Sequence, residues 1–274
     1  MIRDITIGQY YPAKSVLHRL DPRVKLTCTL LYLISLFLFK SIPGYIVATI
    51  FLVAVIRLSK VPFKYIMRGM KPVIMILMVT VIFNLFLTKE GDVLVKVWIF
   101  SVTEGGLRTA VFMAIRLVYL IAGSSLMTFT TTPNELTDGI ESLLHPLNKI
   151  HVPVHEIAMM MSIALRFIPI LLEETDKIMK AQIARGADLE SGNMIQKAKS
   201  MIPILVPLFV SAFRRANDLA MAMESRCYRG GEGRTKMKPL HYASRDYIAY
   251  GIVIVYVAVV VLIGKYVPLH IWIF

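Results

Sequence analysis

Runs of apolar residues alternate with short polar segments through the first half of the 274-residue chain and return at its end. Two runs, 107–129 and 247–264, have about the 20 residues that a membrane-spanning helix needs. A third run, 72–88, is at the lower limit of that length. Two shorter runs, 24–39 and 42–56, follow each other closely. They form either a tight pair of spans or a pair that does not cross fully.

The distribution of positive charge favours two full crossings there. The chain has 31 Lys and Arg residues against 18 Asp and Glu, a net charge of +13. Assigning successive loops to alternate sides puts 25 positive residues on one side and 5 on the other, with Arg116 inside the fourth run. Because cytoplasmic loops are the positive ones, we predict five spans, a cytoplasmic N-terminus and an extracytoplasmic C-terminus. Nucleic acid is not an expected partner, since the positive residues follow this topology.

Composition indicates a membrane protein as well. Hydrophobic residues make up 56% of the chain, above the roughly 45–50% of soluble domains. Residues 1–23 are charged and contain no apolar run, so we expect a cytoplasmic arm and no signal peptide. The two cysteines, Cys28 and Cys227, exclude a disulfide scaffold and a multi-cysteine metal site.

Residues 130–246 form a long block before the last span, which the charge pattern assigns to the cytoplasm. The pattern predicts three helices, at about 133–144, 154–185 and 193–226, with Thr132 capping the first. Along each long helix, apolar and small residues recur at steps of three and four, which places them on one face. We expect other chains or the membrane interface to cover this face. The candidate partner-packing residues are Met161, Ala164, Ile168, Phe209, Phe213, Ala216, Ala220 and Met223.

Both long helices end on an arginine within a similar triplet, Ala184-Arg185-Gly186 in the first and Ser225-Arg226-Cys227 in the second. One interpretation is local, because arginine complements the negative end of a helix and glycine caps it. The other is recognition of a partner, because the guanidinium group binds carboxylates in a planar, bidentate way. The repetition of the triplet favours the second interpretation.

Other candidate chemistry is weak. His145, His151 and His155 lie close in sequence, but a zinc site needs three or four ligands in fixed geometry, and we predict no metal. The glycine-rich segment 230–235 lacks the lysine of a phosphate-binding loop, so we predict that the chain binds no nucleotide. Arg116 inside a span is a functional candidate by default, and the alternative is a structural contact with neighbouring helices.

Several segments together resemble one family, the transmembrane (T) subunit of energy-coupling factor transporters, or EcfT family. They are 8–12, 17–23, 131–138, 166–169, 181–188 and 214–220. The two arginine triplets match the paired coupling motifs of that family, although Ser225 and Cys227 stand where alanine and glycine are usual. The resemblance implies two ABC-type ATPase partners and one substrate-binding membrane subunit. It also implies that ATP binds to the partners, so this chain is expected to be neither an enzyme nor a cofactor-binding protein.

We therefore predict an all-α, multi-pass protein of the cell membrane, with about five spans and three coupling helices, two of them long and crossed. The expected organisation is a cytoplasmic arm (1–23), four spans (24–129), the coupling-helix block (130–246), and the final span with an external C-terminus (247–274). The resemblance implies the energy-coupling subunit of an ATP-driven vitamin or micronutrient importer. A self-sufficient secondary carrier is the alternative, and it would need more spans and inverted repeats.

Overall fold

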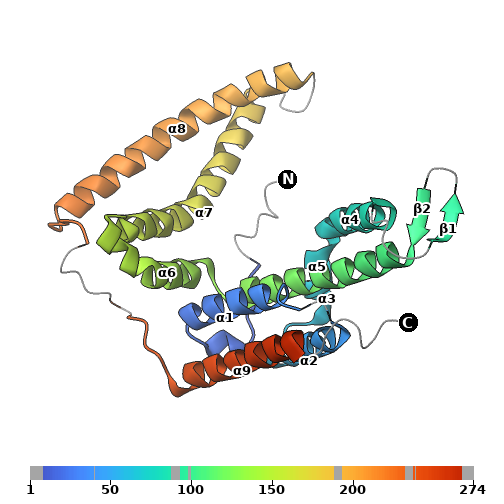
Figure 1. Ribbon diagram of the computed structural model, residues 1–274. Coiled ribbons are helices and arrows are strands. Elements are labelled where there is room, and N and C mark those ends of the chain that lie inside the picture. Colours follow the sequence, from blue (N-terminus) through green and yellow to red (C-terminus); the bar gives the residue numbers. More distant parts are fainter. Residues whose placement is uncertain are drawn as a thin grey trace. The chain divides into compact units, whose positions relative to one another are not determined.

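The computed structural model describes residues 9–39, 41–87, 93–97, 100–187, 193–231, 237 and 239–266. Helices dominate these residues, as Figure 1 shows, and the prediction of an all-α, multi-pass membrane protein is confirmed. The α-helices are α1 (Pro22–Ser35), α2 (Ile42–Ser59), α3 (Phe63–Met70), α4 (Ile74–Leu87), α5 (Glu104–Thr130), α6 (Pro133–Leu144), α7 (Val154–Ala184), α8 (Met194–Glu224) and α9 (Ser244–Tyr266). Three short 3-10 helices join them, η1 (Leu17–Arg19), η2 (Lys71–Val73) and η3 (His145–Ile150).

The chain divides into two compact units. One unit comprises the described residues within Gly8–Gly139 and Leu240–Phe274, so that α9 packs with α1 and α2 although α7 and α8 intervene in sequence. The other comprises the described residues within Ile140–Pro239, which include α7 and α8. We refer to them as the membrane unit and the coupling unit.

Among the described residues, five helices are long and apolar enough to cross a membrane: α2, α5, α7, α8 and α9. The number equals the prediction, but the identities differ in part. The run 24–39 becomes α1, which has only 14 residues and reaches about 21 Å of the roughly 30 Å of bilayer hydrocarbon. The run 72–88 becomes α4, which is bent by 62° from α3. Length and composition also qualify α7 and α8, whose cytoplasmic placement stays a prediction.

A β-hairpin lies before α5, although an all-α fold was predicted from the sequence. Strand β1 (Val93–Val97) pairs antiparallel with β2 (Phe100–Thr103), and Val97 lies opposite Phe100. The Thr103 hydroxyl then accepts a hydrogen bond from the Gly106 amide and caps α5. The hairpin is therefore joined directly to the helix that follows it.

The core of the membrane unit is built from aromatic side chains of α1, α2, α5 and α9. Phe51 stacks on Tyr256 with ring centroids 4.1 Å apart, and Tyr32 lies against both rings. Gly123 of α5 allows this approach, because a β-carbon there would lie 2.4 Å from the Tyr32 ring. These contacts hold four helices side by side (Figure 1).

The helix boundaries of the 133–226 region agree closely with those predicted from the sequence. Helix α6 begins at Pro133, and Thr132 and Glu135 cap it reciprocally through side-chain-to-amide hydrogen bonds of 3.3 Å. Pro169 lies inside α7 without ending it, and α7 changes direction along its length in Figure 1. Pro203 and Pro207 likewise lie inside a continuous α8.

Candidate functional site

Helix α7 ends in a Schellman motif that places Arg185 at the last position before the chain reverses. The Gly186 amide donates to the Ile183 carbonyl at 2.9 Å, and the Ala187 amide donates to the Gln182 carbonyl at 3.0 Å. Gly186 has φ 88°, the left-handed conformation that glycine adopts without strain. The predicted glycine cap is therefore confirmed.

Helix α8 ends in the same motif with a different residue at the reversal. The Cys227 amide donates to the Glu224 carbonyl at 2.8 Å, and the Tyr228 amide donates to the Met223 carbonyl at 3.1 Å. Cys227 has φ 57°, so a residue with a β-carbon occupies the left-handed position that Gly186 has in α7. Arg226 precedes it, as Arg185 precedes Gly186.

The left-handed conformation of Cys227 leads to a prediction. A left-handed residue with a β-carbon costs roughly 1–2 kcal/mol relative to glycine. We expect Cys227→Gly to raise the free energy of unfolding of the coupling unit by about 1 kcal/mol, partly offset by greater flexibility of the unfolded chain. Amide hydrogen exchange of the last turn of α8 measures this, and faster exchange in the variant would contradict it. Cys227→Ala, which keeps the β-carbon, is the matched control.

Arg185 and Arg226 are both exposed. No hydrogen bond or ion pair from either guanidinium group to another residue occurs in the part of the chain that the structure describes. Each is thus a free, planar donor at a rigidly capped helix end. The geometry is compatible with both interpretations of the triplets, and partner recognition by Ala184, Arg185, Gly186, Ser225, Arg226 and Cys227 stays a prediction.

The two long helices are joined by a polar contact near their middles. Arg215 of α8 donates through Nη2 and Nε to Oε2 of Glu174 of α7, at 2.8 and 3.2 Å, and the Ser211 hydroxyl donates to Oε1. The side chains are 40% and 23% exposed, so the pair is accessible to water. Nearer the end of α7, the Gln182 amide donates to the Pro203 carbonyl at 3.3 Å. Polar contacts therefore join the two helices at two points.

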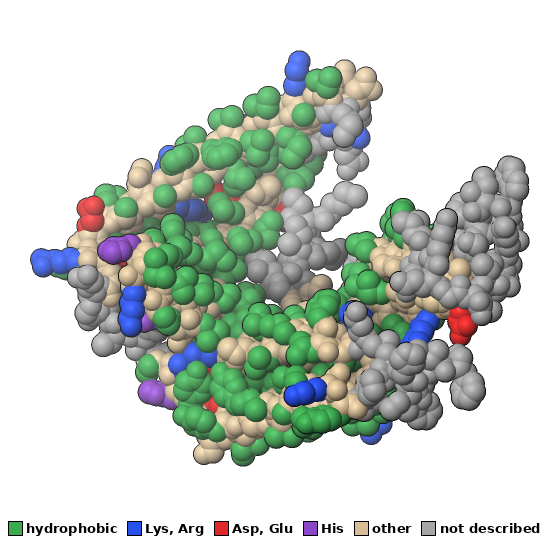
Figure 2. All heavy atoms as spheres, in the orientation of Figure 1, with side chains coloured by type: hydrophobic (Ala, Val, Ile, Leu, Met, Phe, Trp, Pro, Cys, Tyr) green, Lys and Arg blue, Asp and Glu red, His purple; other side chains and the backbone are tan. Residues whose placement is uncertain are grey.

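On α8 the predicted partner-packing face lies away from this contact. On α8, Ile204, Ser211 and Arg215 share the face that meets α7, whereas Val206, Phe209 and Phe213 lie on the opposite side. Phe209 is 61% exposed and Phe213 is 68% exposed. Figure 2 shows hydrophobic side chains along α8. Of the eight candidate residues, Met161, Ala164, Ile168, Phe209, Phe213, Ala216 and Ala220 are exposed and Met223 is partly buried.

The remaining sequence candidates take structural roles. His155 Nδ1 lies 2.9 Å from Glu141 Oε1, and within the described residues no group of three metal-ligating side chains occurs. Arg116 donates to the carbonyl of Phe39 at 3.1 Å and lies over the Phe37 ring. Arg116 thus binds the segment that follows α1, which agrees with the alternative of a structural contact with a neighbouring helix.

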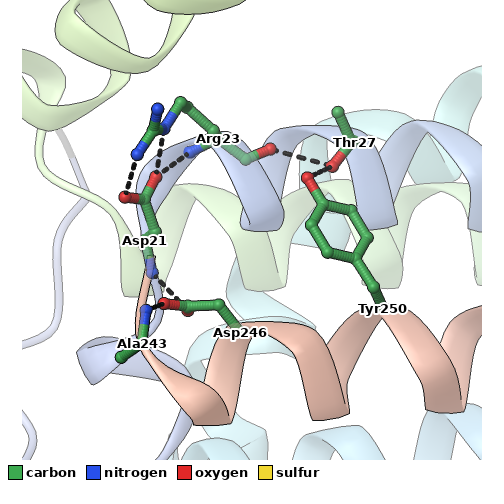
Figure 3. A network of polar contacts seen from close by, with 6 residues as sticks. All are labelled: Asp21, Arg23, Thr27, Ala243, Asp246 and Tyr250. Atoms are coloured by element: carbon green, nitrogen blue, oxygen red, sulfur yellow. Dashed lines mark hydrogen bonds and ion pairs between the residues drawn. The ribbon is translucent and has the colours of Figure 1, made fainter. Parts of the chain in front are cut away.

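A buried polar network that joins the starts of α1 and α9 was not predicted (Figure 3). Asp246 is 1% exposed and accepts hydrogen bonds from the backbone amides of Asp21 and Ala243, at 2.9 and 2.8 Å. Asp21 caps α1 and pairs with Arg23 at 2.9 Å. Hydrogen bonding to Asp21 raises the pKa of the Arg23 guanidinium, which also lies 4.0 Å from the centre of the Tyr242 ring. Asp246 therefore links the residue before α1 to the start of α9 through hydrogen bonds.

The fold defines a helical, multi-pass membrane protein, and comparison with known proteins gives its family. A family model described as CbiQ, cobalt transport protein, matches residues 13–237. The energy-coupling factor transporter transmembrane protein EcfT of Clostridium kluyveri is 60% identical over 250 residues, which are 91% of this chain and 93% of the relative. The protein of the same name from Bacillus subtilis is 50% identical over 246 residues, 90% and 93% of the two chains. The chain belongs to the EcfT family of energy-coupling transporter membrane subunits.

Proposed function

We propose that this chain transmits the movement of two ABC-type ATPase subunits to a substrate-binding membrane subunit that imports a vitamin or another micronutrient. The observation that carries the proposal is the pair of equivalent helix ends. Arg185 and Arg226 occupy the same position of the same capping motif, are exposed, and lack an intramolecular ion pair among the described residues. Two identical ATPases would offer two equivalent acidic or carbonyl sites for them.

The long helices themselves supply the transmission. When the ATPases close on ATP, their grooves move the ends of α7 and α8, and the Glu174–Arg215 contact makes the two helices respond together. The exposed apolar face of α8 then pushes on the substrate-binding subunit, which reorients and releases its substrate. All chemistry resides in the partner chains, so this chain needs no cofactor of its own.

Affinity isolation of the tagged full chain from native membranes tests the proposal. We expect two ATPase chains and one small membrane protein to co-purify, and the chain purified alone to bind no ATP. Transport of a substrate by the chain reconstituted alone would instead support a secondary carrier and overturn the proposal.

The exposed apolar face makes a separate prediction. Phe209→Ala with Phe213→Ala should leave the unfolding of the isolated chain nearly unchanged, because both side chains are more than 60% exposed. Truncating aromatic anchors costs about 2 kcal/mol or more each, which is roughly a 30-fold loss of affinity. The measurement is recovery of the substrate-binding subunit with the purified chain. Phe63→Ala, at an equally exposed phenylalanine of α3, is the matched control, and equal recovery for both variants would refute the role of this face.

A further inference from the structure

The membrane unit contains a mainly apolar cavity of about 210 Å³, and Lys25 and Arg245 are among the residues that line one end of it. Four helices line it, and each contributes its terminal turn: Lys25 near the start of α1, Arg245 at the start of α9, Leu58 near the end of α2 and Thr130 at the end of α5. The cavity is partly open at its side, beside exposed apolar residues such as Ile248 and Ile252.

Two cations, Lys25 and Arg245, lie at this end of the cavity, and neither forms an ion pair in the described part of the chain. Lys25 is 6% exposed, and its ammonium donates to two neutral carbonyls, those of Thr130 at 2.8 Å and His18 at 3.3 Å. An ammonium has three N–H donors, so these two acceptors leave one donor over. No carboxylate lies within 4.0 Å of Lys25 or of the exposed Arg245 in the described part of the chain.

The acids nearby are already engaged. Asp21 pairs with Arg23, both oxygens of Asp246 accept backbone amides, and Glu135, which also acts electrostatically on Lys25, accepts a hydrogen bond from the Thr132 amide. None of these acids forms an ion pair with Lys25 among the described residues, and an anion that enters this end of the cavity would lower the cost of burying its charge. The charge at this end therefore calls for an anionic ligand.

The other end calls for a hydrocarbon chain. From these residues the lining continues for seven residues along α1, α2 and α5, to Tyr32, Phe51 and Gly123, and for eight along α9, to Val253. Seven helical residues extend about 10 Å, the length of roughly eight methylene groups of an extended chain. No charged side chain contributes to the lining beyond Lys25 and Arg245.

We propose that this cavity binds one anionic phospholipid, with the headgroup phosphate at Arg245 and Lys25 and one acyl chain between α1, α2, α5 and α9. The lipid belongs to the leaflet on the side of the positive 57–71 segment, because α2 ends and α3 begins there. This site is separate from the exposed faces of α7 and α8 and does not depend on the proposed transport function.

Native mass spectrometry of the delipidated full chain in detergent tests the site. The probes are dioleoyl-phosphatidylglycerol and dioleoyl-phosphatidylcholine, which have the same acyl chains and different headgroup charge. We expect one retained phosphatidylglycerol and weaker retention of phosphatidylcholine. Arg245→Ala should lower phosphatidylglycerol retention about fivefold, the effect of one cation near a membrane surface.

Two further variants separate the site from general attraction to lipid. Arg57→Ala removes an exposed arginine at the same end of the membrane unit but outside the cavity, and it should leave retention unchanged. Ala249→Trp fills the cavity and should abolish retention of both lipids, with thermal unfolding as the check on folding.

Three results would overturn the proposal. Equal retention of the two lipids by the wild-type chain would show that charge is not recognised. Equal effects of Arg245→Ala and Arg57→Ala would show general surface attraction. Displacement of the lipid by excess glycerol 3-phosphate would show a phosphate site with no role for the acyl chain.

Discussion

Replacing Arg185 or Arg226 by alanine should weaken binding of the ATPase subunits far more than it weakens the chain itself. Breaking a buried charged pair at an interface costs about 2–5 kcal/mol, because the partner group is left unpaired. That corresponds to a loss of affinity of roughly 30-fold or more for each variant. Lysine should restore little, since it lacks the planar fork that donates two parallel hydrogen bonds. The measurement is the amount of ATPase that co-purifies, together with uptake in cells.

The local interpretation of the same residues predicts a different outcome. If the arginines only complement the helix ends, each substitution costs about 0.3–1 kcal/mol of helix stability, and assembly stays near wild type. Under partner recognition, by contrast, the double variant should insert normally and keep its substrate-binding subunit while losing uptake. Arg108→Ala is the matched control, because the charge pattern places Arg108 on the opposite side of the membrane. Normal ATPase recovery for both single variants would end the assignment of these residues.

The helices between residues 133 and 226 were predictable because their ends carry chemical signals. Thr132 and Pro133 mark the start of α6, and Gly186 marks the end of α7. Such signals fix a boundary to within a residue or two, since capping side chains and left-handed residues act locally. The position of Arg185 at a helix end followed from the same reasoning.

The first apolar run shows that hydrophobicity alone does not predict where a helix ends. It continues to Phe39, but α1 ends at Ser35, because apolar composition does not determine where the backbone turns. The turn depends on tertiary contacts: Arg116 binds the Phe39 carbonyl, and Gly44 leaves room for the Phe39 ring, which a β-carbon would approach to 2.5 Å. These partners lie on other helices and are not visible in a local pattern.

The left-handed backbone conformation of Cys227 could not be predicted from the sequence either. Cysteine has no preference for this conformation, so the triplet Ser225-Arg226-Cys227 looked like a departure from the first one. The backbone hydrogen bonds show that the two helix ends share one motif. The capping geometry is thus retained even where the side chain is unfavourable.

Loss of the Asp246 side chain should strongly destabilise the membrane unit. It lies 225 positions from Asp21 in sequence, and neither the apolar pattern nor the charge count singles it out. Its two oxygens accept the amides of Ala243, the residue before α9, and of Asp21, the residue before α1, and the side chain is 1% exposed. In the Asp246→Ala variant both amides lose their acceptor, and each unsatisfied buried donor costs about 1–3 kcal/mol.

We therefore expect Asp246→Ala to lower the free energy of unfolding by about 3 kcal/mol. Asp246→Asn should lose about half as much, because its single carbonyl oxygen can serve one amide while its NH2 group faces the other. Asp218→Ala, at an exposed aspartate of α8, is the control and should change stability by less than about 0.5 kcal/mol. Thermal and denaturant unfolding in detergent measure all three. If Asp246→Ala unfolds like the control, the start of α9 is held by its apolar contacts with α1 and α2, and the polar network contributes specificity without stability.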